Sequence, residues 1–136
     1  MQDPTHTAVA VLYVDLDRFK VINDVLGHAA GDELLASAAQ RIANAVGTEG
    51  LVARFGGDEF LVVCNVADDQ QRPERIAGAV LHSLADSFRF DNEEFTITAS
   101  IGIARAPTDG ERPQSLIQNA DAAMYDSKRR SRNAWQ

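Results

Sequence analysis

Near the middle of the chain stands the sequence Arg54-Phe55-Gly56-Gly57-Asp58-Glu59-Phe60, between two short apolar runs. These runs, residues 51–53 and 61–64, are rich in Val and Leu, a composition that favours β-strands. Two adjacent glycines between such runs predict a tight hairpin, because the favoured turns need a positive φ at one or both central positions. The glycines taken alone indicate no more than this turn.

The two acids after the glycines indicate more than a turn. Asp58 and Glu59 stand side by side at the mouth of an apolar run, where two carboxylates repel each other unless a cation or a proton lies between them. The absent side chains of Gly56 and Gly57 would also let a phosphate approach the backbone closely. The combination predicts a metal–nucleotide site.

The bulk composition is that of a soluble globular domain. The 136 residues suffice for one domain, residues 1–136, with a substantial core, and they are 45% apolar and 24% charged. No apolar run approaches the roughly 20 residues of a membrane span, and the N-terminus lacks the pattern of a signal peptide. The single cysteine, Cys64, lies in an apolar run and is expected to be a buried thiol. We therefore expect a cytoplasmic protein, in which residues 1–7 are disordered or left from cloning.

The charge balance argues against general nucleic-acid binding. There are 13 basic and 20 acidic residues, a net charge of −7. A small basic cluster, residues 128–132, has no interleaved aromatic side chains on which bases could stack. A polyanionic nucleotide can still bind where positive charge and metal ions are concentrated locally.

A second pair of acids follows the first predicted strand. Residues 8–14 are almost wholly apolar, as in a strand covered on both faces, and the sequence Asp15-Leu16-Asp17 comes next. On a strand, Asp15 and Asp17 would share one face and could both approach a cation. The alternative is a turn that ends the strand and leaves both acids in solvent.

The remaining elements follow from the spacing of apolar residues and from the positions of glycine and proline. A short helix over 19–26 ends at Gly27, and a longer one, opened by Gly31 and Asp32, extends to residue 46. A third helix starts at Pro73, an alternating strand covers 95–103, and a last helix starts at Pro113. Several polar residues have simple structural explanations as surface, loop, capping or helix-dipole residues: Asn23, His28, Asp32 and Lys128.

This order predicts an α+β fold with a β-α-β-β-α-β core and helices on a sheet that contains antiparallel strands. In such a layout the end of the first strand can lie beside the hairpin turn. Asp15 and Asp58 would then converge on one point.

The central sequence Gly-Gly-Asp-Glu-Phe, residues 56–60, resembles the signature of the GGDEF family, the diguanylate cyclases. Three further blocks resemble the family in the same order. They are residues 15–24 with Gly27-His28 and Gly31-Asp32, then Thr98 to Gly102, and then Ala120 to Tyr125 with Lys128 and Arg132-Asn133. The resemblance thus covers residues 8–133.

The resemblance implies a fold related to the palm of nucleotidyl cyclases and polymerases, which is of the ferredoxin-like type. It also implies that two GTP molecules condense to cyclic di-GMP and two pyrophosphates, with two Mg²⁺ or Mn²⁺ ions per site. By position, the metal ligands would be Asp15, the Leu16 carbonyl, Asp58 and Glu59. Either Asp58 or Glu59 would help to deprotonate the attacking 3′-hydroxyl. The substrate-binding residues would be Asn23, Asp32 and His28 for guanine, and Arg18, Phe19, Lys20, Gly56, Gly57, Lys128 and Arg132 for the phosphates.

The chemistry of these side chains agrees with the implied roles. Guanine offers two donors and an acceptor along one edge, which suit the carboxylate of Asp32 and the carboxamide of Asn23. Mg²⁺ prefers carboxylate and phosphate oxygens, and phosphoryl transfer depends on positioning and charge neutralisation. Because one domain holds one GTP, the resemblance implies that catalysis needs a homodimer, and an N-terminal sensor domain is expected in the parent protein.

The sequence departs from the family in three places. The family's N-terminal helix has no counterpart, since only residues 1–7 precede the first strand, so we expect a truncated domain of reduced activity. The inhibitory Arg-x-x-Asp motif is replaced by Gly47-Thr48-Glu49-Gly50, which predicts no product inhibition there, and Ser131 stands where relatives usually have Gly. The alternative function is a GTP-binding regulatory or scaffold module with little or no turnover.

Overall fold

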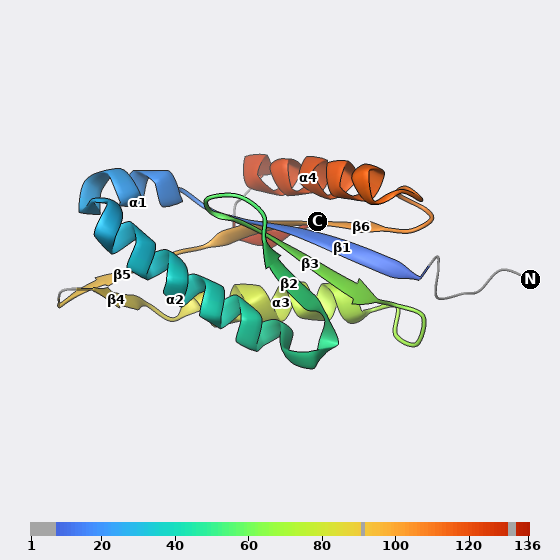
Figure 1. Cartoon of the computed structure of the whole chain (residues 1–136), viewed down its shortest axis with the longest axis horizontal. Coiled ribbons are helices and arrows are strands. Elements are labelled where there is room, and N and C mark those ends of the chain that lie inside the picture. The colour runs from blue at the N-terminus through green and yellow to red at the C-terminus, as the bar shows by residue number, and fades with distance from the viewer. Residues whose placement is uncertain (1–7, 91, 131–132) are drawn as a thin grey trace, which may run out of the picture.

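The computed structural model describes residues 8–90, 92–130 and 133–136. In chain order the elements are β1 (Val9–Leu16), α1 (Phe19–Leu26), α2 (His28–Val46), a 3₁₀ turn η2 (Gly47–Glu49), β2 (Leu51–Arg54), β3 (Glu59–Asn65), α3 (Arg72–Ala85), β4 (Phe88–Phe90), β5 (Glu93–Phe95), β6 (Ala99–Arg105), α4 (Pro113–Arg130) and β7 (Ala134–Trp135). Figure 1 shows their arrangement.

The main sheet has five strands in the order β2-β3-β1-β6-β7. The central strand β1 is antiparallel to both β3 and β6, β2 is antiparallel to β3, and the β6–β7 pair is parallel. The predicted α+β class and the β-α-β-β-α-β core are thereby confirmed. The end of β1 lies beside the β2–β3 turn, as predicted, and Asp15 is opposite Glu59 in the register of the sheet.

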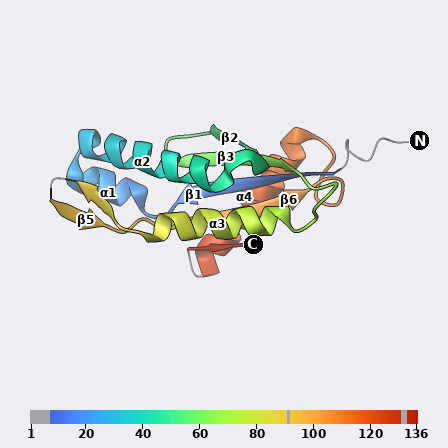
Figure 2. The same ribbon diagram turned by 90° about the horizontal axis from the view of Figure 1, so that it is seen from below.

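Helices cover both faces of this sheet. Helices α2 and α3 lie side by side on one face, and α4 lies on the other (Figures 1 and 2). The larger core forms under α2 and α3 around Leu12, Val14, Ile42, Phe60 and Ile101, and the smaller one lies under α4. Both faces of β1 are therefore buried, which explains its unbroken apolar sequence.

Two predicted elements have different bounds, and one hairpin was not predicted. Helix α2 begins at His28, three residues before the predicted opening at Gly31, because the Gly31 N–H already bonds to the Gly27 carbonyl. The predicted strand over 95–103 is broken at residues 96–98, although Ile97 is buried as its alternation suggested. The separate hairpin β4–β5 was missed, because its strands are only three residues long.

The turn between β2 and β3 also differs from the prediction. Neither Gly56 nor Gly57 has a positive φ, so the tight two-residue hairpin was wrong. The last strand pair is Arg54 with Phe60, and the Phe55 N–H still donates to the Glu59 carbonyl at 2.8 Å. The Arg54 guanidinium donates to the carbonyls of Gly56 (3.2 Å) and Gly57 (2.8 Å). The side chain of Arg54 thus supports a longer loop from within.

Within the described ranges, none of the helices is both long and apolar enough to cross a bilayer.

Candidate functional site

The candidate site forms where β1 ends beside the β2–β3 turn. Asp15 stands between Glu59 of β3 and Ser100 of β6 in the register of the sheet. One residue later, the Leu16 N–H donates to the Asp58 carbonyl across 3.1 Å. Asp15, Asp58 and Glu59 therefore lie on adjoining strand ends, in the layout that the sequence predicted.

The Asp15 carboxylate forms an ion pair with Lys128 from the last turn of α4. The Nζ atom of Lys128 donates to Oδ2 of Asp15 at 2.9 Å. Burial raises the pKa of Asp15, and the hydrogen bond and charge of Lys128 oppose that shift. The charges of Asp58 and Glu59 raise the Asp15 pKa further, so the three carboxylates interact electrostatically.

Asp17 approaches the same cation as Asp15, as predicted from their shared face, because Lys128 Nζ is 3.9 Å from Asp17 Oδ1. Its side chain is 2% exposed, so the alternative of a solvated acid was wrong. It accepts hydrogen bonds from the hydroxyls of Thr98 and Ser100, both at 2.7 Å, and from the Asn133 N–H at 3.0 Å. Asp17 thus ties the end of β1 to β6 and to the chain after α4.

Tyr13 forms the apolar side of the site. Its ring packs edge-on against Phe55 of the turn, with the centroids 5.7 Å apart. Burial raises the pKa of Tyr13, and a hydrogen bond with the Glu59 carboxylate adds to the increase. The hydroxyl of Tyr13 is therefore held protonated beside Glu59.

The donor set suits a cation that shares its ligands with a substrate. Across the residues described here, no three Asp, Glu, His or Cys side chains are grouped so that they could hold a metal ion by themselves. Mg²⁺ is commonly bound by one or two carboxylates together with substrate phosphates and water. The half-buried Asp15 and Asp58 with nearby backbone carbonyls fit that pattern, whereas a closed protein cage is not formed.

The residues predicted for phosphate binding gather at the start of α1. Arg18 has a left-handed backbone (φ 56°), a conformation that costs about 1 kcal/mol in a non-glycine residue. The N–H groups of Val21 and Ile22 both bond to the Arg18 carbonyl, so those of Phe19 and Lys20 precede the first hydrogen bond of the helix. Such N–H groups form a ready site for an anion. The side chain of Lys20 is exposed, and that of Phe19 is buried.

The residues predicted for the base lie between α1 and α2. Asn23 Nδ2 is 3.2 Å from His28 Nδ1. A Cβ atom at Gly31 would overlap with the Asn23 side chain, so the absence of a side chain at Gly31 is what lets Asn23 lie against α2. Asp32, the next residue, is exposed on the same first turns of α2. Arg132, also predicted to bind phosphate, lies outside the described residues.

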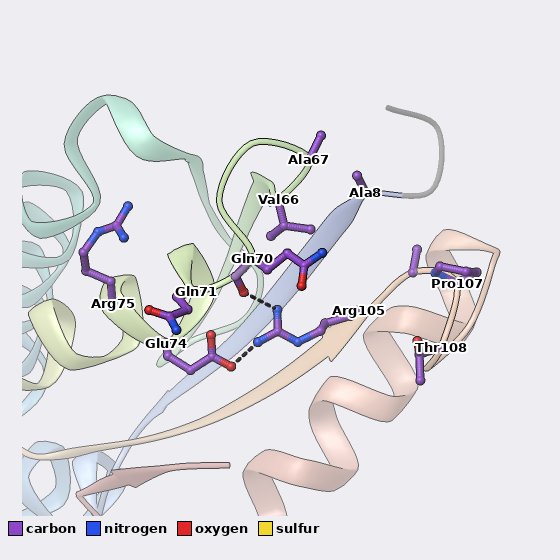
Figure 3. Close-up of a pocket in the computed structure, with 11 residues that line it drawn as sticks. Ala8, Val66, Ala67, Gln70, Gln71, Glu74, Arg75, Arg105, Pro107 and Thr108 are labelled. Atoms are coloured by element: carbon purple, nitrogen blue, oxygen red, sulfur yellow. Dashed lines mark hydrogen bonds and ion pairs between the residues drawn. The ribbon is translucent and has the colours of Figure 1, made fainter. Parts of the chain in front are cut away.

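One cavity lies at the other end of the sheet and contains none of the predicted site residues. It has a volume of about 1040 Å³ and is lined by Ala8, Val66, Ala67, Gln70, Gln71, Glu74, Arg75, Arg105, Ala106, Pro107 and Thr108 (Figure 3). Its central cation, Arg105, is already bound to the Glu74 carboxylate and to the Gln70 carbonyl. We therefore place the candidate site at the carboxyl end of β1 and not in this cavity.

Sequence reasoning missed three features of the site. The Lys128–Asp15 pair joins residues 113 positions apart, and no local pattern reveals such a contact. The hydrogen bonds of Asp17 come from Thr98, Ser100 and the Asn133 N–H, which are more than 80 positions away in the sequence. Tyr13 was hidden within an apolar run, although a phenol two residues before Asp15 shares its face of the strand.

Comparison with known proteins gives one consistent result. The family model described as "Diguanylate cyclase, GGDEF domain" matches residues 1–134. Diguanylate cyclase TpbB of Pseudomonas aeruginosa is 42% identical over 127 residues, which are 93% of this chain and 29% of TpbB. The cyclic di-GMP phosphodiesterase NbdA of the same species is 37% identical over 92% of this chain and 16% of its own length.

A solved structure of an EAL/GGDEF domain protein from M. capsulatus superposes with a TM-score of 0.88. It is 45% identical, and the match covers 94% of this chain and 83% of that one. The fold is thus the nucleotidyl-cyclase palm. The chain spans only 16% to 29% of the length of the two curated relatives.

Proposed function

The chain belongs to the GGDEF family, and on this basis we propose that it is a diguanylate cyclase domain that condenses two GTP into cyclic di-GMP and two pyrophosphates. The observation that carries the proposal is the meeting of Asp15, Asp58 and Glu59 beside a cation, Lys128, at one end of β1. Carboxylates hold divalent cations and accept protons, and a nearby ammonium binds phosphate. These are the requirements of phosphoryl transfer.

The metal-binding residues in this proposal are Asp15, the Leu16 carbonyl, Asp58 and Glu59. When bound, two Mg²⁺ or Mn²⁺ ions would neutralise the phosphates and stabilise the charge that develops on their oxygens. Asp58 or Glu59 accepts the proton of the 3′-hydroxyl, whose oxygen then bonds to the α-phosphorus of the other GTP. The bond from that phosphorus to the pyrophosphate oxygen breaks, and a second such step closes the ring.

The other residues position the nucleotide. The N–H groups at the start of α1, Lys20, Lys128 and Arg132 bind the phosphates, with Gly56 and Gly57 leaving the turn backbone accessible. Asn23 and Asp32 bind the guanine edge, and His28 lies on the same nucleotide.

Each step needs two nucleotides, and one domain offers one such set of residues. We therefore propose that catalysis takes place in a homodimer with the two sites facing each other. A sensor domain elsewhere in the parent protein would control that pairing. We place the reaction in the cytoplasm, whose reducing conditions suit the free, buried thiol of Cys64.

The test is formation of cyclic di-GMP from GTP and Mg²⁺, followed by chromatography. We expect Asp58→Asn to lower the rate about a hundredfold or more, and the exposed Asp24→Asn on α1 to leave it unchanged. A homodimeric reaction predicts a rate that rises more steeply than linearly with protein concentration. Equal rates in wild type and Asp58→Asn would contradict the proposal.

A second candidate function is a GTP-binding regulatory module with little turnover. The relative NbdA favours it, because a protein named as a phosphodiesterase contains a domain 37% identical to this one. Mg²⁺-dependent GTP binding without any product would support this candidate over the cyclase.

A further inference from the structure

Lys128 is the cation that neutralises Asp15. Their charged atoms are 2.9 Å apart, and the side chains are only 22% and 14% exposed. Among the described residues, no other cation forms an ion pair with Asp15. The ammonium therefore takes the place beside Asp15 that a divalent cation would need.

The neighbouring Asp17 does not depend on Lys128 in the same way. The Nζ atom is 3.9 Å from Asp17 Oδ1, beyond hydrogen-bond distance. Asp17 already accepts hydrogen bonds from two hydroxyls and from the Asn133 N–H. If Lys128 moved away, Asp17 would keep its hydrogen bonds, and Asp15 would lose its partner.

We propose that Lys128 is an exchangeable counter-ion of Asp15: it neutralises the carboxylate while no divalent cation is bound and turns to the nucleotide phosphates when a cation displaces it. The inference rests on the proposed function, because it takes Asp15 as a metal ligand. Lysine suits this role, since its ammonium is a compact charge on a flexible chain. An unneutralised Asp15 would be costly beside Asp58 and Glu59.

The exchange couples the two ligands of the site. A divalent cation must compete with Lys128 for Asp15, so it binds weakly to the nucleotide-free domain. Once displaced, the ammonium is free for phosphate, so each ligand favours the other. The same residue would thus oppose metal binding before the nucleotide arrives and support nucleotide binding afterwards.

The first test measures binding of Mn²⁺ to the nucleotide-free protein by electron paramagnetic resonance of the free ion. We expect Lys128→Met to bind Mn²⁺ about five- to tenfold more tightly than wild type. The matched control is Arg129→Met, which removes the same charge from the next, exposed residue of α4 and should change the affinity less than about twofold.

The same Lys128 variant should bind the nucleotide less tightly. Lys128→Met should bind a GTP analogue with a methylene group between the α- and β-phosphorus atoms more weakly than wild type does. If the substitution merely damaged the structure, it would weaken the binding of both Mn²⁺ and the GTP analogue.

A second measurement uses the wild-type side chain and so does not depend on a variant that folds. The chain has two lysines, Lys20 and Lys128, which ¹³C-methylation labels without loss of charge. Mg²⁺ alone should move the Lys128 methyl signal toward its position in Asp15→Asn and leave the Lys20 signal unmoved.

The possible outcomes distinguish a failure of the Lys128 exchange from a failure of the proposed metal site. Mn²⁺ binding that Asp15→Asn abolishes and Lys128→Met leaves unchanged would overturn the exchange and keep the metal site. A Lys128 signal unmoved at saturating Mg²⁺ would overturn it likewise. If Asp15→Asn binds Mn²⁺ as wild type does, both the exchange and the proposed role of Asp15 are wrong.

Discussion

Gly102 of β6 lies directly against the backbone of α4 at Ala120. A Cβ atom on Gly102 would overlap with the Ala120 carbonyl oxygen and the Met124 nitrogen, neither of which can move without the helix. We expect Gly102→Ala to lower the free energy of unfolding by about 2 kcal/mol or more, measured by urea denaturation.

The matched control for that variant is Gly78→Ala in α3. No atom lies within 4 Å of the added carbon there, and alanine favours the helix. The free energy of unfolding of this variant should therefore rise by about 0.5–1 kcal/mol. Equal effects of the two substitutions would contradict the close packing of β6 on α4.

The hydrogen bonds of Asp17 predict a structural role. Asp17→Ala should lower the free energy of unfolding by about 2–4 kcal/mol, because two hydroxyls and one N–H lose a charged acceptor. Asp24→Ala, an exposed acid of α1, serves as the control. Stability equal to that of the control would show that these bonds contribute nothing.

Gly31 predicts an effect on nucleotide affinity. Gly31→Ala would displace the Asn23 side chain, which can move, and should weaken binding of the GTP analogue about tenfold while the melting temperature changes little. Calorimetric titration measures the affinity, with the exposed Ser37→Ala of α2 as the comparison. Unchanged affinity would argue against Asn23 as a guanine ligand.

Glu49 is expected to contribute to the stability of the fold in a pH-dependent way. Hydrogen bonds from Arg75 and Arg72 lower the pKa of Glu49 below its usual range. A lowered folded-state pKa means that this stabilisation is present above the unfolded pKa of about 4.3 and is lost as the pH falls through the folded value.

Glu49→Gln should therefore lower the melting temperature at pH 7 and have much less effect at pH 3. The comparison is Glu33→Gln, an exposed acid of α2. A difference between wild type and Glu49→Gln that persists at pH 3 would rule out the ionic origin.

The segment around Glu49 also predicts the response to product. Gly47 and Gly50 carry no side chains that could bind the product, and Glu49 is engaged with α3. We expect cyclic di-GMP not to inhibit through residues 47–50, as measured by product titration in the cyclase assay. Tight binding that is lost on mutation of Thr48 or Glu49 would refute this expectation.

The sequence was sufficient for the elements with long apolar periods. The long helix that extends to residue 46 was predicted correctly, because its buried residues, among them Leu34, Leu35 and Ile42, recur at helical spacing. It was insufficient for the Gly56-Gly57 turn, whose carbonyls accept hydrogen bonds from the side chain of Arg54, and for the three-residue strands β4 and β5. The meeting of Asp15 with the β2–β3 turn followed from topology, but its partner Lys128 depends on how α4 packs, which no local pattern encodes.

The position of β1 has a consequence for how the domain fluctuates. Asp15 is on the central strand, which is hydrogen-bonded on both sides, so its amide should exchange with solvent only in global unfolding. Asn23 belongs to α1, an eight-residue helix in which Phe19 is the single buried residue, and such a helix can open locally. The acidic end of the site is thus built into the slowest-exchanging part of the domain, whereas the side that would meet the base can adapt to its ligand.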